Sequence, residues 1–357
     1  MTLAVSDRSL DCGGALVVSA DVSEAEWDRF VNASPDSSGY HLWRWRRVFE
    51  RTFRHRTLYL AARSSEGEVV GVLPAVIIRS WLFGRFMVSL PFVNYGGVLA
   101  ARDAVARTLV DHAALAARAE GVSHLELRHS VRRFDDLPVK QHKVAMLMPL
   151  AADEALAWNR LDRKVRNQIK KAQKSDLTAE VGGRELVDDF FDVFAQNMRD
   201  LGTPVHPRRF FHEVFEQFPS RARVVVVRQG TMAVAAAIGY RYRDTFEIPW
   251  ASSLRSHRAL CPNNLLYWRA IQQATADGCL TFDFGRSTPD EGTFHFKEQW
   301  GAEPSPLFWE YRMLTGGQVP DQSPKNPKFK AAIAVWKRLP LPVATWLGPA
   351  VMRSIAG

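Results

Sequence analysis

The feature that most constrains the fold is an order of elements that the chain passes through twice. Each half begins with helical segments, continues with strands joined by short turns, and then has a long helix followed by further strands. The first half has RTLYLAARSS and VVGVLPAVIIR around Glu66–Gly67, and the second has RARVVVVRQG and MAVAAAIGYRY around Gly230. We therefore predict an α+β protein of two tandem domains, each built on a mixed, largely antiparallel sheet.

The length of 357 residues suits two domains of ordinary size. We expect the first domain at residues 1–150, the second at 151–318, and a tail at 319–357. The strand KVAMLMPL should close the first domain, and PLFWEYRML should be the last strand of the second. The predicted helices span residues 22–33, 40–53, 102–120, 151–175, 184–201, 207–218 and 263–277.

Several classes of protein are disfavoured by what the chain lacks. There is no GxGxxG or GxxxxGK[ST] loop, which disfavours Rossmann and P-loop enzymes. Three scattered cysteines and histidines without ligand spacing suggest neither a disulfide framework nor a structural metal. The start has no continuous apolar stretch, and no segment is apolar enough to cross a bilayer, so we expect a cytoplasmic protein, with possible peripheral contact at the inner face of the membrane.

The net charge of +9 is concentrated in two segments. Residues 160–174 carry a net +6 and residues 321–357 a net +5, which leaves the rest of the chain near −2. Each segment is a candidate contact for phosphates, tRNA or an anionic membrane, although a run of charge is more often plain solvated surface.

The tail combines basic residues with bulky apolar ones. FKAAIAVWKRLPLPVATWLGPAVMRSIAG is interrupted by prolines and preceded by a Pro-rich stretch. Residues 328–357 could lie on a membrane surface, or pack back on the globular body, which we consider the more usual outcome for apolar side chains.

The basic segment at 160–174 predicts an amphipathic helix. Leu161, Val165, Ile169 and Ala172 share one face at helical spacing, which suits packing on a domain. The other faces carry the predicted polyanion or tRNA contacts, in which arginine forks suit phosphate oxygens. These are Arg163, Lys164, Arg166, Lys170, Lys171 and Lys174.

Two further segments suggest chemistry in the second half. WASS is followed by PNNLLYW, which reads as a strand and then a helix capped by an Asn after Pro. FDFGRS is followed by GTFHFKEQWGAEP, where Asp283 lies on the strand face opposite Phe282 and Phe284. Lys297 could stabilise an acyl oxyanion and Asp283 could accept a proton from an amine, or the two could form a plain salt bridge.

These segments, in this order, resemble the FemAB family. The resemblance rests on RKVRNQIKKAQKS, WASS before PNNLLYW, FDFGRS, FHFKEQWGAEPSPLFW and, more loosely, PFVNYGG. It is strongest over residues 150–315 and closest to the subgroup found beside exosortase (PEP-CTERM) and exopolysaccharide genes. The family includes aminoacyltransferases of peptidoglycan cross-bridges and has two acetyltransferase-like (GNAT) domains, which implies that fold here.

The resemblance also implies roles for matched residues. Lys297 resembles the lysine that stabilises the acyl-donor end or the tetrahedral intermediate, and Asp283 belongs to the same strand motif. Phe92, Asn94, Tyr95 and Gly96 resemble the first-domain loop that lines the acceptor groove. In the second half, the implied substrate contacts are Trp250, Ser252, Asn263, Arg286, His295 and Trp300. The RxxGxG/A turn of coenzyme A-using enzymes is absent before residues 263–277, and 151–175 leaves no room for the long coiled-coil insertion of some relatives.

We carry three hypotheses from the sequence. The first is transfer of an acyl or aminoacyl group, with aminoacyl-tRNA as donor, to an amine of a cell-wall precursor or envelope polysaccharide, by a monomer or weak dimer. The second replaces the donor by acyl-CoA or an acyl carrier protein. The third is a non-catalytic scaffold that docks export machinery at the membrane through its tail. In each case the acyl donor is a co-substrate and no tightly bound cofactor is expected.

Overall fold

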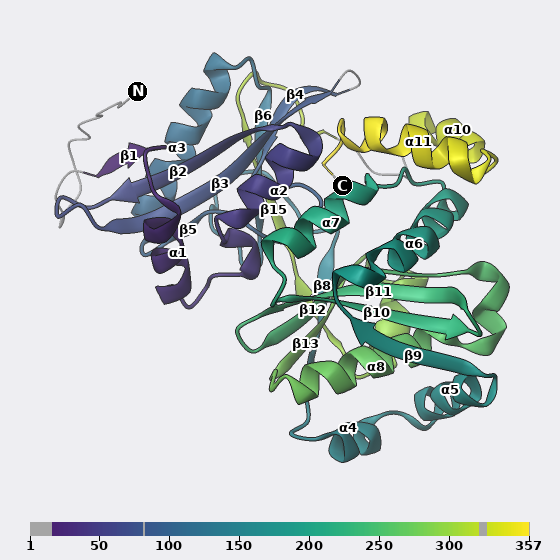
Figure 1. The fold of residues 1–357 in the computed structure, drawn as a ribbon. Helices are drawn as coiled ribbons and strands as arrows, with labels where there is room; N and C mark the ends of the chain where they lie inside the picture. Colours follow the sequence, from purple (N-terminus) through teal and green to yellow (C-terminus); the bar gives the residue numbers. More distant parts are fainter. Residues whose placement is uncertain (1–15, 81–82, 321–326, 357) are drawn as a thin grey trace. The chain divides into compact units, whose positions relative to one another are not determined.

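A computed structural model describes residues 16–80, 83–320 and 327–356, and two compact units emerge from it (Figure 1). The first unit comprises residues 1–141, 307–320 and 353–357, and the second comprises residues 142–306 and 321–352. Both are mixed-sheet α+β units, as predicted. The chain therefore leaves the first unit for the second, returns to the first with one strand, contributes two tail helices to the second, and ends in the first.

The sheet of the first unit has the order β1-β2-β3-β4-β6-β15-β7, with β5 paired to β3. Its neighbours are antiparallel except β4 and β6, which are parallel. The strands are β1 Val17–Ser19, β2 Arg56–Arg63, β3 Val69–Ser80, β4 Gly84–Val88, β5 Leu99–Ala100, β6 His124–His129, β7 Val139–Lys140 and β15 Phe308–Met313.

The helices of this unit form as their apolar spacing predicts. They are α1 Glu24–Ala33, α2 Arg44–Phe53 and α3 Asp103–Ala119, with a short 3₁₀ helix at Gly39–His41. Trp45, Phe49 and Phe53 of α2 are buried at i, i+4 and i+8. Leu109 and Ala113 of α3 pack in one apolar cluster with side chains of β2, β3 and β6. Each fully buried leucine of this kind contributes about 1.5–3 kcal/mol.

The sheet of the second unit has the order β14-β8-β13-β12-β11-β10-β9. Among the strands that the structure describes in it, only β12 and β13 are parallel neighbours. The strands are β8 Val144–Pro149, β9 Leu177–Gly182, β10 Ala222–Gln229, β11 Met232–Tyr242, β12 Thr245–Ser253, β13 Thr281–Ser287 and β14 Glu303–Pro306.

Helices lie on both faces of this second sheet (Figure 1). On one face α5 and α8 share an apolar cluster with alternate residues of β10 and β11, while α6 contacts the strands from the other face. The helices are α4 Glu154–Arg160, α5 Arg163–Lys174, α6 Val187–Leu201, α7 Arg208–Gln217, α8 Pro262–Ala276, α9 Gly292–Glu298, α10 Pro327–Trp336 and α11 Leu341–Met352. Two 3₁₀ helices occur at Arg184–Leu186 and Arg255–Leu260.

Two strands belong to a different sheet from the one expected. The strand at 144–149 pairs with β13 and β14 of the second sheet, and the strand at 308–313 pairs with β6 and β7 of the first. Local apolar patterns predict that a strand forms, but the choice of sheet depends on partners far away in sequence. The expected boundaries at 150 and 318 therefore differ from the division seen in the structure.

The predicted helix at 151–175 is instead two helices. Leu161 is extended at the end of α4, and Asp162 caps α5 by accepting a hydrogen bond from the backbone N–H of Lys164 at 2.6 Å. The Asp side chain satisfies a backbone donor that a continuous helix would have paired internally, which favours a new start here. Leu161, Val165, Ile169 and Ala172 are buried as predicted.

The tail forms α10 and α11, which pack on the second unit. The carbonyl of Leu339 accepts a hydrogen bond from Arg199 Nη1 at 3.2 Å, and α11 contacts α6. The side chain of Lys328, which belongs to the basic tail, is not among those that the structure describes; in this segment they begin at Lys330. The inner face of the tail therefore packs on the globular body, which is one of the two alternatives expected from the sequence.

Candidate functional site

The candidate site lies where the two parallel strands of the second sheet stop pairing. Residues 245–247 of β12 pair with residues 281–283 of β13, and the ladder ends at Glu247 and Asp283. On its other edge β13 pairs with β8, both at residues 281–283 and beyond the end of the parallel ladder. Directly opposite residues of parallel strands point to the same face, so the two carboxylates project together while Phe246 and Phe282 enter the core on the other face.

A β-bulge in β13 follows directly. The register opposite β8 shifts between Asp283 and Arg286, and Gly285 has φ +74°. Asp283 Oδ1 accepts a hydrogen bond from the Gly285 N–H at 2.7 Å, which holds the turn of the backbone. Glycine suits this position because side chains disfavour positive φ. Bulges of this kind commonly redirect groups beside functional sites.

Helix α9 presents Lys297 to the bulge. Its ammonium Nζ donates to the carbonyls of Gly285 at 2.9 Å and Arg286 at 3.1 Å. Two of the three ammonium N–H groups are thereby used, and one remains for another acceptor. The side chain is only 6% exposed, so its charge is held in a largely dry environment.

Burial moves the pKa values of Asp283 and Lys297 toward each other. Asp283 is 1% exposed, and burial raises its pKa from 3.8 to about 7, against the opposing effects of the Gly285 N–H and of Lys297. Burial lowers the pKa of Lys297 from 10.5 to about 8, partly offset by the charges of Asp283 and Glu247. A carboxylate and an ammonium that both titrate near neutral pH suit proton transfer and charge stabilisation.

Other predicted substrate contacts of the second unit lie in its core. Trp250 packs edge-on against Phe210 and Phe211, and Ser252 Oγ accepts a hydrogen bond from Asn197 Nδ2 at 3.0 Å. Trp300 packs beside Phe284, with its Nε1 buried and without a partner among the residues that are described. Their role as substrate contacts remains a prediction.

Two further predicted residues are more accessible. Arg286 is half-buried at the bulge. His295 is exposed on α9, where its Nδ1 lies 2.9 Å from Glu298 Oε2. Both lie within three residues of Asp283 or Lys297 in sequence, so they border the candidate site on its two elements.

The start of α8 differs from the predicted asparagine cap. Cys261, with φ +60°, occupies the cap and Pro262 is the first helical residue, so Asn263 lies inside the first turn. Proline favours this first position because its fixed φ suits a helix and its missing N–H costs nothing there. Asn264 instead donates from Nδ2 to Gln168 Oε1 of α5 at 3.0 Å, which ties the two helices together.

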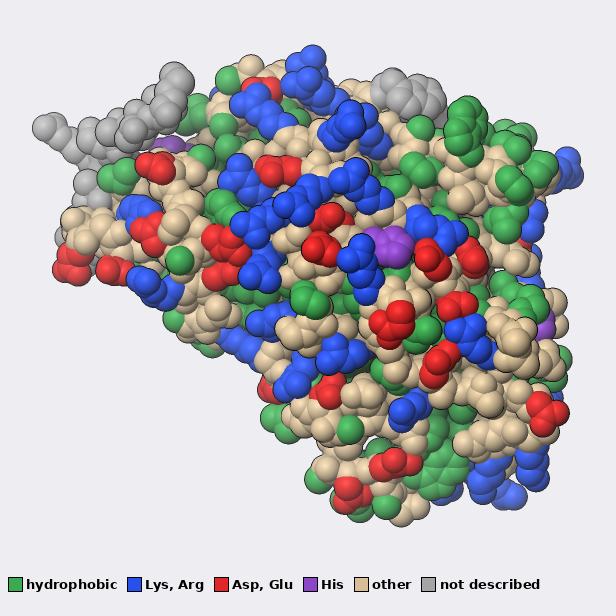
Figure 2. Space-filling model, viewed as in Figure 1, with side chains coloured by type: hydrophobic (Ala, Val, Ile, Leu, Met, Phe, Trp, Pro, Cys, Tyr) green, Lys and Arg blue, Asp and Glu red, His purple; other side chains and the backbone are tan. Residues whose placement is uncertain are grey.

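Helix α5 displays its basic face as predicted. All the predicted contacts are exposed except Arg166, which is half-buried, and none forms an ion pair within the described part of the chain. Figure 2 shows Lys and Arg side chains gathered over this helix. Lys170 also lies over the ring of Trp158 of α4, 5.9 Å from its centroid.

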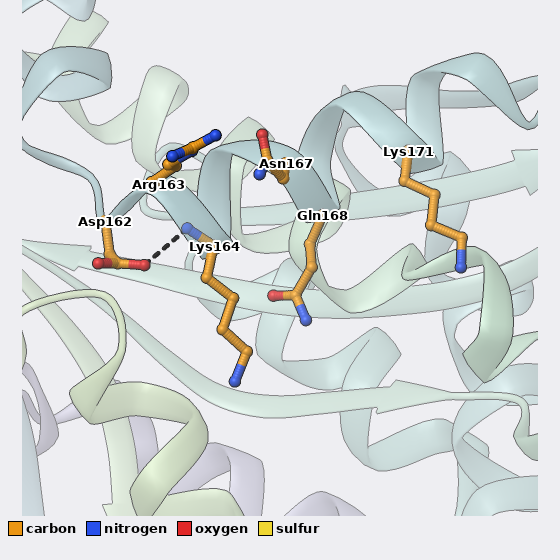
Figure 3. Close-up of a pocket in the computed structure, with 6 residues that line it drawn as sticks. All are labelled: Asp162, Arg163, Lys164, Asn167, Gln168 and Lys171. Atoms are coloured by element: carbon orange, nitrogen blue, oxygen red, sulfur yellow. Dashed lines mark hydrogen bonds between the residues drawn. The ribbon is translucent and has the colours of Figure 1, made fainter.

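An open hollow of about 470 Å³ lies along this helix (Figure 3). Lys164, Gln168 and Lys171 extend to one side of the helix, and Arg163 and Asn167 to the other, with Asp162 at the N-terminus. Because every lining residue comes from one helix and its cap, the hollow is a surface feature suited to an extended polyanion.

The predicted acceptor loop lies in the first unit, after β4. Asn94 is buried, Tyr95 lies 5.9 Å from Tyr40 between ring centroids, and Gly96 has φ +127°. The loop is held at both ends: the Phe92 N–H donates to the Ala356 carbonyl at 2.9 Å, and the Val98 N–H donates to His129 Nε2 at 3.0 Å. Phe92 has φ +68°, a strained conformation that this anchoring supports.

Sequence reasoning missed several buried polar residues. Glu247 could have been suspected as the one acidic residue within the apolar strand TFEIPWASS. In the first unit, Glu126 pairs with Arg128 at 2.8 Å, and His129 Nδ1 lies 2.6 Å from Glu310 Oε2. The similarity of LELRH to FDFGRS could have pointed to Glu126, Arg128 and His129 in the first unit.

No group of three or more His, Cys, Asp or Glu residues in the described ranges is arranged to hold a metal ion. Likewise, none of the helices in those ranges is long and apolar enough to span a membrane.

The second unit matches a known domain family. Residues 159–298 match the family "Acetyltransferase (GNAT) domain". A comparison with curated protein sequences finds no match. The matched region contains α5, the parallel strand pair, the bulge and Lys297, so it includes the candidate site.

Solved structures share the fold over most of the chain. FemX superposes with a TM-score of 0.65 at 15% identity over 82% of this chain and 96% of that chain. A tandem GNAT protein from the clavulanic acid biosynthesis pathway gives 0.52 at 11% identity, over 85% and 100%. L-PGS from Bacillus licheniformis gives 0.51 at 13% identity, over 87% and 96%. The protein thus has two GNAT-like domains, and the family match together with the fold supports an acyltransferase.

Proposed function

We propose that this protein transfers an acyl or aminoacyl group to an amine of a cell-wall precursor or envelope polysaccharide, with its chemistry at Asp283 and Lys297. The observation that carries the proposal is this buried pair at the end of a parallel strand ladder, with both pKa values near neutrality. A structural salt bridge has no need of pKa values near the working pH, whereas acid–base chemistry does.

The proposed reaction assigns one task to each residue. The neutral amine attacks the carbonyl carbon of an activated ester, a C–N bond forms, and the carbonyl oxygen becomes an oxyanion. Lys297 donates its remaining N–H to that oxyanion. Asp283, ionised, accepts the proton that the nitrogen loses. When the intermediate collapses, the ester C–O bond breaks and the departing alkoxide takes a proton from Asp283, so the carboxylate is restored.

Helix α5 favours aminoacyl-tRNA as the donor. Its exposed Lys and Arg side chains have no carboxylate partners within the described ranges, so a polyphosphate chain can neutralise them without breaking existing ion pairs. The similar fold of L-PGS, a lysylphosphatidylglycerol synthetase, is consistent with transfer of an aminoacyl group. The acceptor would lie along the loop at Asn94, Tyr95 and Gly96, as in the FemAB resemblance.

A second candidate donor is acyl-CoA. The GNAT family match favours it, because that family is described as acetyltransferases. The segment before α8 forms the 3₁₀ helix Arg255–Leu260 in place of an RxxGxG/A turn, which favours tRNA. We further propose a cytoplasmic monomer or weak dimer that works beside export or polysaccharide machinery of the exosortase type.

The decisive variant is Lys297→Ala. Removing an oxyanion donor lowers the turnover of comparable enzymes by about 100- to 1,000-fold, and we expect that loss here. The assay uses the purified full chain, a peptidoglycan precursor with a free amine, and either aminoacyl-tRNA or acyl-CoA. Lys143→Ala is the matched control, since Lys143 donates to Thr288 in the same unit at 2.6 Å.

The outcomes separate the hypotheses. Loss of transfer in Lys297→Ala with an unchanged melting temperature supports the proposed site, and the donor that is consumed identifies the donor class. Wild-type turnover in Lys297→Ala would refute it. Wild-type function of the same variant in cells, with no transfer by either protein, would indicate the non-catalytic scaffold.

A further inference from the structure

The outer face of the tail helices is apolar and basic. Between residues 330 and 346, the exposed side chains are either apolar or cationic. The apolar ones are Ala331, Ala332, Ala334, Val335, Pro340, Pro342, Val343 and Trp346, and the cationic ones are Lys330, Lys337 and Arg338. Figure 2 shows hydrophobic side chains gathered over α10 and α11, with Lys and Arg side chains beside them.

The inner face of the same helices is already packed. A Cβ added at Gly202, which follows α6, would lie 2.6 Å from Ile333, and one added at Gly348 would lie 2.8 Å from the Val205 carbonyl. Ala344 and Met352 are buried. The exposed apolar residues therefore form a second face of these helices, separate from the face that packs on the second unit.

Two properties of this outer face distinguish it from ordinary surface. Trp346 is 78% exposed, although large aromatic side chains are normally covered. Residues 322–357 contain no Asp or Glu, and the three exposed cations have no ion pair within the described part of the chain. An indole beside unpaired Lys and Arg matches the interface of a bilayer, where rings lie at the headgroup level and cations meet phosphates.

We propose that α10 and α11 bind the surface of an anionic bilayer through this outer face. The helices lie in the interface rather than cross it: ten and twelve residues span about 15 and 18 Å, against a hydrocarbon core of about 30 Å. Charge selects the bilayer over a second copy of the chain, because two tails of net +5 would repel each other face to face.

Point variants test this better than truncation. Deleting the tail would also remove the Ala356 carbonyl, which accepts hydrogen bonds from the Phe92 N–H and from Arg128. We would measure binding of the full chain to phosphatidylglycerol-containing vesicles and to pure phosphatidylcholine vesicles by co-sedimentation. Trp346→Ser removes the indole, and Leu280→Ser, at an exposed leucine after α8, is the matched control.

The wild type should bind the anionic vesicles in a salt-sensitive way, with a blue shift of tryptophan fluorescence that Trp346→Ser abolishes. Replacing Lys330, Lys337 and Arg338 by Gln should weaken binding by about fivefold per residue. Leu280→Ser should bind like the wild type, as should Lys164→Gln/Lys171→Gln in α5.

Three results would overturn the proposal. One is equal binding to both kinds of vesicle, or to neither. Another is loss of binding only in the α5 variant, which would locate the anion contact there. The last is a concentration-dependent dimer that Trp346→Ser dissociates, which would make this face a contact between copies. None of these depends on catalysis, so the outcome is independent of the proposed function.

Discussion

Each unit has an acidic residue at the end of its parallel strand pair, but the groups that surround the two carboxylates differ. In each sheet one parallel strand pair ends at an acidic residue, Glu126 beside Val88 in the first and Asp283 beside Glu247 in the second. Glu126 is matched by Arg128 at 2.8 Å and by the Tyr311 hydroxyl at 3.0 Å. Asp283 faces a lysine whose own pKa is depressed.

On the function that we propose, this difference separates a structural group from a reactive one. Arg128 donates to Glu126, Val93 and Ala356 and lies 4.2 Å from the ring centroid of Trp309, so its guanidinium is surrounded by fixed partners. In the second unit the extra residue Gly285 interrupts the equivalent sequence and turns two carbonyls toward Lys297. A one-residue bulge thus accompanies the change from a closed ion pair to a titratable pair.

The largest expected effect follows from breaking the first-unit pair. Arg128→Met leaves Glu126 charged and buried, and removal of one partner of a buried pair costs about 3–5 kcal/mol. Glu126→Gln/Arg128→Met should recover much of that loss, because neither position then carries an unpaired charge. Urea unfolding measures both variants. A loss below roughly 1 kcal/mol, the range of exposed pairs, would mean that the pair is not structural.

Acid should weaken the first unit before the second. Burial lowers the pKa of two histidines of the first unit, His41 and His55, to about 4, and the pKa of one histidine of the second unit, His206, to about 3. A lowered folded-state pKa gives stability that is complete above 6.5 and is lost as the pH falls through 4. Each of these three histidines would then cost roughly 3 kcal/mol by pH 4, so the first unit, which holds two of them, loses about twice as much stability as the second.

Hydrogen exchange at pH 5 and 7.5, corrected for intrinsic rates, measures the loss of stability in each unit. Protection should fall first in peptides of the first unit, and His55→Phe should reduce that fall, since His55 stacks on Phe53 in an apolar setting. Parallel loss of protection in both units would contradict the assignment.

A smaller effect should come from the bulge. Gly285→Ala forces a side chain to φ +74°, at a cost of about 1–2 kcal/mol, and moves the carbonyls that hold Lys297. Gly278→Ala has nearly the same cost at φ +72°, with open space around the new Cβ and no contact to the site. Both should lower the melting temperature similarly, but only Gly285→Ala should slow transfer. Equal transfer rates would show that the bulge has no catalytic role.

Much of this fold was predictable because its signals are local. The hairpins of β2–β3 and β10–β11 and the apolar stripe of α2 follow from short-range patterns, and the structure confirms them. The exchange of β8 and β15 between sheets was not predictable, because it depends on pairing partners more than a hundred residues away. The same holds for the bulge at Gly285, which exists only in register with β8.

The candidate site was partly predictable. The order of the motifs along the chain predicts a site at Asp283 and Lys297, but it predicts neither their burial, which sets their pKa values, nor Glu247 beside them. From the sequence alone, a single acidic residue in an apolar strand cannot be assigned to the residue beside which it will lie in the sheet. The internal similarity of LELRH and FDFGRS becomes informative only once both segments are seen to end a parallel pair.

The pH dependence of transfer tests the central claim most directly. Asp283 must be ionised, so the rate should rise as the pH increases through about 7. Lys297 must be protonated, so it should fall again above about 8. In kcat/KM, which reports the free enzyme, the wild type should give a narrow bell between these values, and Asp283→Asn should lose the rising limb along with most of its activity. An Asp283→Asn enzyme with a wild-type rate and an unchanged rising limb would contradict the account.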